Sequence, residues 1–415
     1  MSDDPCIPAE HDSPCVHCGL CLDTCPTYRL TGVEAESPRG RLYLMSAVTE
    51  GGMPIDRDTI EHLDSCLGCL ACESACPSGV HYGRRIEEFR PQIVRSRLGA
   101  RRRVRALLAR AGANARLLRV ASGVASAFDR IGFERLRRHI PGLSLIPRHT
   151  SSPIRPVVPR PATPRLRVAL LVGCVADQMR PAITSSAMNV LHRNGVEVIL
   201  LPSGMCCGAL DRHAGRSEAA ARAVAVMCSA VEKARVDHLV TTAAGCGAAV
   251  RRFEELFSQS NPVRGIAQHV GRSSRDICEL LVEIGLRPPQ PRIPSERAVA
   301  YHDACHLLHG CGLARAPREI LGAAGIRWVD LGENAICCGS AGVYNLLHPH
   351  LASALARRKA DLLIEKGVSD VAIGNIGCIM QFELALARSG RTDVMVWHPI
   401  ELLDAAYASE AQGRF

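Results

Sequence analysis

The sequence predicts an α+β protein of several domains, with a mostly helical N-terminal domain followed by two tandem α/β repeats of parallel βαβ units. Three observations lead to this fold class. Two cysteine runs lie within the first 90 residues, a proline-rich stretch occupies residues 140–165, and four cysteines then recur at a nearly constant offset. These features divide the 415 residues into segments 1–94, 95–165, 166–290 and 291–415, in keeping with the length, which favours about two to three domains.

The first segment carries two runs with the spacing C-x2-C-x2-C-x3-C-P. The runs are Cys15, Cys18, Cys21, Cys25 and Cys66, Cys69, Cys72, Cys76. This spacing is typical of bacterial two-cluster ferredoxins, in which the fourth cysteine of each run ligates the other cluster. We therefore expect two [4Fe–4S] clusters in a ferredoxin-like domain. The expected ligands are Cys15, Cys18, Cys21 and Cys76 for one cluster, and Cys66, Cys69, Cys72 and Cys25 for the other.

The main alternatives to iron–sulfur clusters are zinc and disulfides. Zinc sites also use C-x2-C pairs, but they need neither a third cysteine nor a C-P end. Met1–Glu10 has no secretory signal, so we expect a cytoplasmic chain with reduced thiols, either free or peripheral on the inner face of the membrane. No apolar run reaches the roughly 18 residues of a membrane span, and the 4% aromatic content argues against nucleic-acid binding.

The 51 residues between the two runs leave room for an insertion, and Arg39–Glu50 and Pro54–Leu63 are predicted to be helical. Nine arginines between Arg95 and Arg119 alternate with leucines, which predicts a basic amphipathic helix pair broken near Gly112. This pair is either a surface for anionic lipid or an acidic partner, or a solvated helix face. The proline-rich linker follows it.

Beyond the linker, four cysteines are duplicated. Cys174, Cys206, Cys207 and Cys246 match Cys305, Cys337, Cys338 and Cys378, with an offset of 131 residues for the first three and 132 for the last. Both double cysteines precede glycine and both final cysteines follow glycine. Self-similarity of this kind indicates duplicated structural units.

Short apolar runs precede these cysteines and alternate with helical stretches such as Pro181–Asn194 and Ser217–Ala234. The predicted strands are Arg167–Val172, Val196–Leu201, Asp237–Thr242, Ala298–His302, Ile326–Leu331 and Val371–Gly374. This alternation favours βαβ units on a parallel sheet. Each cysteine then follows the carboxyl end of a strand, where open α/β sheets place their ligands.

With these motifs the chain resembles the glycolate oxidase iron–sulfur subunit family, in which two ferredoxin motifs precede two cysteine-rich CCG domains like those of heterodisulfide reductase. The supporting segments are Gly173-Cys174, Cys206-Cys207-Gly208, His302-Asp303-Ala304-Cys305-His306, Cys337-Cys338-Gly339 and Gly377-Cys378. The resemblance implies an electron-transfer subunit that receives electrons from an FAD-containing flavoprotein partner oxidising glycolate to glyoxylate. It also implies a membrane or quinone-linked acceptor.

One departure concerns the CCG motif, which ends in C-x2-C in heterodisulfide reductase. Here Ala249 and Gln381 occupy the last position, so each repeat keeps four cysteines rather than five. Four interpretations stay open: a conventional cluster, a vestigial site, a thiol and partner surface, or unmetallated buried cysteines. The cluster of His302, Asp303, His306 and His309 beside Cys305 is expected only to hydrogen-bond the thiolates.

The chain has no complete G-x-G-x-x-G and no P-loop, so we expect no catalytic residue in it, with substrate oxidation on the partner's flavin. The alternatives are the iron–sulfur subunit of a lactate or glycerol-3-phosphate dehydrogenase, a heterodisulfide-type thiol reductase subunit, and a structural or regulatory iron–sulfur protein. Four further cysteines, Cys6, Cys228, Cys278 and Cys311, lack a partner at the repeat spacing and are expected to be small core residues.

Overall fold

The computed structural model describes residues 15–96, 115–130, 157–290, 298–333, 336–391 and 393–412. The predicted helix pair before Ala115, most of the proline-rich linker and Cys6 lie outside these residues. Residues 157–165 form no helix or strand. In the part described, no helix combines the length and the apolar character that crossing a bilayer requires.

The N-terminal domain is a small helical unit, as the sequence predicts. Its helices are α1 (Pro26–Thr31), η1 (Glu34–Glu36), α2 (Pro38–Thr49), α3 (Arg57–Asp64), α4 (Ala71–Ser74) and α5 (Tyr82–Arg95). Helix α2 begins where the Ser37 hydroxyl accepts the Gly40 amide, and α3 begins where Asp56 accepts the Thr59 amide. A small apolar core around Leu63 and Ile86 joins α2, α3 and α5.

The first repeat is an open parallel sheet of order β2-β1-β3-β4. Its strands are β1 (Leu166–Leu171), β2 (Val196–Leu200), β3 (His238–Thr241) and β4 (Ser274–Asp276). Its helices are α9 (Ala176–Met179), α10 (Ala182–Arg193), α11 (Ala209–His213), α12 (Ser217–Ala234), α13 (Ala244–Val250), η3 (Phe253–Leu256), α14 (Val263–Ser273) and α15 (Ile277–Glu283). Val168 and Leu170 pack under α10 and α15, whereas Ala169 and Leu171 pack under α12 and α14, so both faces of the sheet are covered.

The second repeat has the same topology, with order β6-β5-β7-β8. Its strands are β5 (Val299–His302), β6 (Trp328–Asp330), β7 (Asp370–Ile373) and β8 (Met395–Trp397). Its helices are η4 (His306–Gly310), α16 (Arg315–Ala323), α17 (Tyr344–Leu347), α18 (Pro349–Lys366), α19 (Ile376–Arg388) and α20 (Pro399–Gln412). The two repeats share one large apolar core, and α20 packs on α10 of the first repeat.

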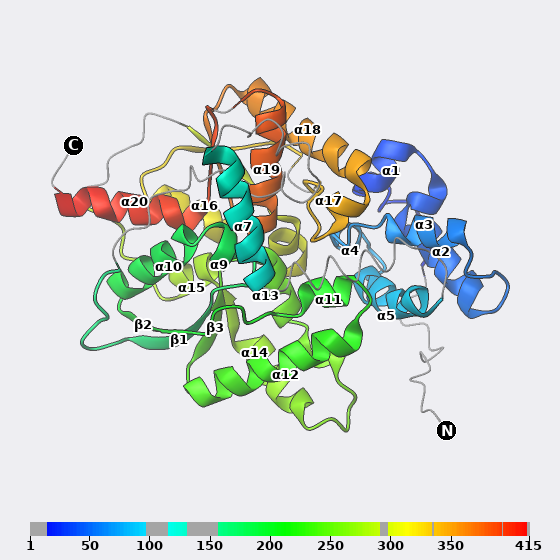
Figure 1. Cartoon of the computed structure of the whole chain (residues 1–415), viewed down its shortest axis with the longest axis horizontal. Helices are drawn as coiled ribbons and strands as arrows, with labels where there is room; N and C mark the ends of the chain where they lie inside the picture. The colour runs from blue at the N-terminus through cyan, green and yellow to red at the C-terminus, as the bar shows by residue number, and fades with distance from the viewer. Residues whose placement is uncertain are drawn as a thin grey trace.

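The three units meet in one molecule (Figure 1). The N-terminal helices gather at one end, where α1 lies against α18 and α5 against α11. Helix α7 (Ala115–Arg130) lies against α9 of the first repeat. The chain direction reverses between β1 and β3, and between β5 and β7, so each sheet has a topological switch point at its carboxyl edge. That edge is where the cysteines of each repeat lie.

Candidate functional site

The outer cysteine group consists of Cys15, Cys18, Cys21 and Cys76. Cys18 is exposed, and the other three are half-buried and pack against the core of the N-terminal domain. The Val80 amide donates to the sulfur of Cys76 at 3.5 Å. The fourth cysteine of the second run therefore lies against the same core as two cysteines of the first run.

The inner cysteine group consists of Cys25, Cys66, Cys69 and Cys72. All four are buried, and all four line one small cavity between the two runs. The Gly68 amide and the Tyr82 hydroxyl each donate to the sulfur of Cys66 at 3.4 Å. Gly68 has φ of +64°, a conformation that costs glycine little and that lets the loop fold back on the sulfur. Hydrogen bonds of this kind stabilise thiolate ligands.

A buried arginine gives the inner group its positive charge. Arg41 is 1% exposed, and its Nη1 lies 4.0 Å from the sulfur of Cys25. Its Nη2 donates to a carboxylate oxygen of Glu36 at 2.7 Å, and its Nε donates to the carbonyl of His62. Burial by itself favours the neutral thiol of Cys66, but the charges of Arg41 and Arg90 outweigh it and lower the pKa of Cys66.

The first CCG group consists of Cys174, Cys206, Cys207 and Cys246. These residues follow β1, β2 and β3, and Cys246 lies in the first turn of α13. The sulfurs of Cys207 and Cys246 are 3.2 Å apart. Hydrogen bonds from the thiols of Cys174 and Cys207 lower the pKa of Cys206 to about 3. The Gly208 amide adds a bond to the sulfur of Cys206 at 3.3 Å, so this group holds negative charge on sulfur.

The second CCG group consists of Cys305, Cys337, Cys338 and Cys378. All four are buried. The sulfurs of Cys305 and Cys337 are 3.9 Å apart, and the Gly339 amide donates to Cys337 at 3.4 Å. Cys378 lies in the first turn of α19, where the side chain of Asn375 donates to its sulfur at 3.3 Å.

The two CCG groups open into one cavity of about 360 Å³, which all eight of their cysteines line. The rest of the wall is largely apolar and includes Leu117 and Leu118 of α7. The repeats are joined at this point, because the Ala244 amide donates to the carbonyl of Gly374 and the Gly245 amide to the side chain of Asn375. The cavity offers free thiols, space and inward-directed amides, which fits an iron–sulfur group better than an apolar core.

The inner group and the second CCG group also touch. Cys69 packs in one apolar cluster with Cys305 and Cys337, together with Leu67 and Tyr344. Burial raises the pKa of Cys69, and the neighbouring thiol of Cys305 raises it further. Residues 236 positions apart in the sequence thus lie side by side. The sequence carries no signal for this contact, which depends on how the N-terminal domain docks on the repeats.

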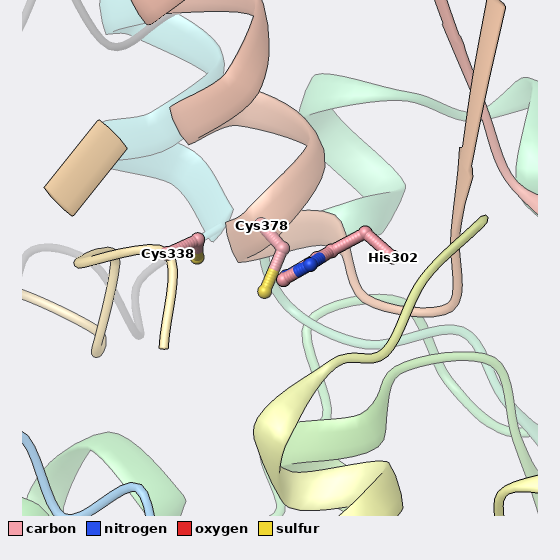
Figure 2. A group of neighbouring side chains, drawn as sticks. All are labelled: His302, Cys338 and Cys378. Atoms are coloured by element: carbon pink, nitrogen blue, oxygen red, sulfur yellow. The ribbon is translucent and has the colours of Figure 1, made fainter. Parts of the chain in front are cut away.

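The histidine cluster beside Cys305 separates in the structure. His306 lines the cavity and hydrogen-bonds Cys305, as expected. Asp303 instead forms an ion pair with Arg318 at 2.7 Å, and His309 bonds the hydroxyl of Ser74 at 2.8 Å. His302 lies near Cys338 and Cys378 (Figure 2). Of the four unmatched cysteines, Cys228 and Cys278 are core residues as predicted, and Cys311 is half-buried.

Comparison with known proteins gives matches over most of the chain. Residues 12–80 match the 4Fe-4S dicluster domain, and residues 168–251 and 299–383 match the cysteine-rich CCG domain. The chain is 34% identical to the glycolate oxidase iron-sulfur subunit of Escherichia coli (strain K12), over 95% of this chain and 94% of that protein. It is 30% identical to the probable glycolate oxidase iron-sulfur subunit of Bacillus subtilis (strain 168), over 91% and 89%.

A third relative has a different name. It is a subunit of the fumarate reductase (CoM/CoB) from Methanothermobacter marburgensis, 26% identical over 95% of this chain and 72% of its own length. The matched domains identify the chain as a carrier of iron–sulfur clusters, two of them [4Fe–4S] clusters in the N-terminal domain.

Proposed function

Because the chain belongs to the family of glycolate oxidase iron–sulfur subunits, we propose that it is the electron-transfer subunit of a complex that oxidises glycolate to glyoxylate. The hydride of glycolate is taken by FAD on a partner flavoprotein, since the sequence carries no dinucleotide fingerprint of its own. The electrons leave this chain for a membrane or quinone-linked acceptor.

We assign one [4Fe–4S] cluster to the outer group and one to the inner group. The lining of one cavity by Cys25 together with Cys66, Cys69 and Cys72 supports the exchange of fourth ligands between the runs. The two CCG groups are assigned further iron–sulfur sites. When bound, such clusters supply one-electron carriers, and the chain contributes thiolates, amide donors to sulfur and the buried charge of Arg41.

The observation that carries this function is the contact of Cys69 with Cys305 and Cys337. It joins the inner group to the second CCG group, which shares its cavity with the first. The four cysteine groups therefore form one uninterrupted series through the molecule. A series of this kind serves electron transfer over a distance, whereas a single structural cluster would not need it.

The exposed end of the series is the outer group. Cys18 is exposed, and Val16 and Leu20 beside it are 62% and 60% exposed. Apolar side chains that flank an exposed cluster ligand suit the approach of a protein partner. We therefore place the flavoprotein at this end and the acceptor beyond the CCG cavity.

A second candidate is a thiol or disulfide reductase with its chemistry at the CCG groups. It is favoured by the cavity that the eight cysteines line, and by the relative named for CoM and CoB. The missing fifth cysteine in each repeat, at Ala249 and Gln381, disfavours it. Disulfide reduction at the cavity by the isolated chain, without the flavoprotein, would favour this candidate.

The test uses the purified chain with and without its flavoprotein. The chain alone should not reduce a dye with glycolate, because no group in it accepts a hydride. In the reconstituted complex, Cys69→Ala should block electron flow to the natural acceptor, while glycolate still reduces the partner's flavin. Cys228→Ala is the matched control, since Cys228 is buried in the core outside all four groups. Glycolate-dependent dye reduction by the flavin-free chain would overturn the proposal.

The same complex separates the substrates. Flavin reduction by lactate or glycerol 3-phosphate, but not by glycolate, would keep the electron-transfer role and replace the substrate.

A further inference from the structure

The last residue of β5 is a buried histidine with nothing to bond. His302 is 1% exposed, and neither ring nitrogen has a hydrogen-bond partner among the described residues. The ring lies against Phe382, with centroids 4.9 Å apart. A buried polar group without a partner costs roughly 1–3 kcal/mol, so it needs an explanation such as a bound ion.

The nearest groups that could supply this explanation are thiols. A ring nitrogen of His302 and the sulfurs of Cys338 and Cys378 all lie within 4.8 Å of one another. Figure 2 shows the imidazole pointing toward the sulfur of Cys378, which comes from the start of α19. Imidazole nitrogen and thiolate sulfur are common ligands of iron and zinc.

The residue that would have been the fifth cysteine is not available as a ligand. The side-chain oxygen of Gln381 accepts from Asn345 at 3.0 Å, and its nitrogen donates to the carbonyl of Ala352 at 3.2 Å. Its amide is therefore satisfied within the fold. The donor that faces the thiols comes from another element, the end of β5.

We propose that an imidazole nitrogen of His302 ligates an iron of the iron–sulfur group at the second CCG site, as a fifth protein ligand beside the four cysteines. The inference rests on the proposed metal occupancy of that site. It makes the two CCG sites chemically different, with mixed ligands in the second and thiolates in the first.

The fold itself does not require this histidine. At the 131-residue offset, the first repeat has Leu171 in place of His302, and both residues end the first strand of their sheet. Leu171 is buried and packs in one apolar cluster with Cys207 and Val224. A leucine is thus compatible with this strand end, which makes His302→Leu a variant that should fold.

The experiment uses the full chain, prepared anaerobically with iron–sulfur clusters and labelled with [15N]histidine. Pulsed EPR of the reduced protein should show a strongly coupled nitrogen that responds to the label. His302→Leu should lose this coupling while keeping most of its iron. His302→Cys should also lose it, keep its iron, and lower the reduction potential of one cluster, because replacing histidine by thiolate at such clusters lowers the potential.

Two further variants keep the test decisive. His398→Gln replaces another buried histidine, whose ring bonds the carbonyl of Thr242 and the amide of Ile400, and it should leave the coupling unchanged. Cys337→Ala should lose iron. An unchanged nitrogen signal in His302→Leu, or no signal in the wild type, overturns the ligand assignment alone. Unchanged iron in Cys337→Ala overturns the metal site and the ligand assignment together.

Discussion

The charge of Arg41 should set the reduction potential of the inner cluster. Reduction adds one negative charge to a cluster, and a nearby cation stabilises that charge. Arg41 is buried, with its Nη1 4.0 Å from the sulfur of Cys25, so solvent does not screen it. Arg41→Gln removes the cation and should lower the potential of the cluster that Cys25 ligates.

The size of the shift follows from Coulomb's law. Unit charges about 4 Å apart interact by roughly 4 kcal/mol at an effective dielectric of about 20. For a one-electron couple this equals roughly 170 mV, since about 59 mV corresponds to a tenfold change, or about 1.4 kcal/mol. The carboxylate of Glu36, 2.7 Å from Arg41, offsets part of this field, and the added electron is spread over the cluster. We therefore expect a fall of about 50–150 mV.

Potentiometric titration followed by EPR would measure the shift for each cluster separately. Arg41→Gln alone leaves the carboxylate of Glu36 buried and unpaired, which can cost about 3–5 kcal/mol of stability. The double variant Arg41→Gln/Glu36→Gln removes both charges, so it should show a smaller shift and better folding. Arg57→Gln changes an exposed arginine of α3 and serves as the control. Equal potentials in the single variant and the wild type, with full iron content, would refute the reasoning.

Two further predictions concern ligation and backbone geometry. Cys76→Ala should change the EPR signal of the cluster held by the first run, and Cys25→Ala that of the second; changes confined to each residue's own run would contradict the exchange of ligands. Gly339 has φ of +86°, and a Cβ there would lie 2.8 Å from the carbonyl oxygen of Ala352, so Gly339→Ala should lower the free energy of unfolding by about 2 kcal/mol or more. Gly322→Ala, in open space on α16, should instead raise it by about 0.4–1 kcal/mol, and denaturant unfolding of the two variants would measure the difference.

The sequence predicted the parts of the fold that carry a local signal. Helix α12 has the predicted bounds, and the six predicted strands are present within a few residues. Two strands were missed, β4 and β8, each three residues long. The sequence of β4, Ser-Arg-Asp, has no apolar run, and it pairs only with β3 at the sheet edge. Its register comes from tertiary packing rather than from its own residues.

The same distinction holds for the candidate site. Motif spacing could predict which cysteines belong together, because ligand spacing is local in sequence. It could not predict Arg41, since a buried arginine in a helix looks like any surface arginine until the helix is packed. The role of His302 was also underestimated, because its distance from Cys378 depends on the alignment of β5 with β7 in the sheet.

The docking of the N-terminal domain decides whether the four cysteine groups stay in series. Domains joined by a linker move relative to each other unless their interface holds them. Here the interface has two parts. The apolar cluster around Cys69 faces the second repeat. On the side of the first repeat, the buried carboxylate of Glu87 in α5 pairs with Arg212 at 2.8 Å and with Arg252 at 3.2 Å.

These ion pairs are costly to break, because separating them would leave a carboxylate uncompensated in a largely buried position. Apolar contact on one side and paired charges on the other restrict both sliding and rotation of the N-terminal domain. The separation between the inner group and the CCG cavity is then set by the packed interface, not by the proline-rich linker. A change in linker length should therefore leave electron transfer intact, whereas loss of the Glu87 pairs should impair it.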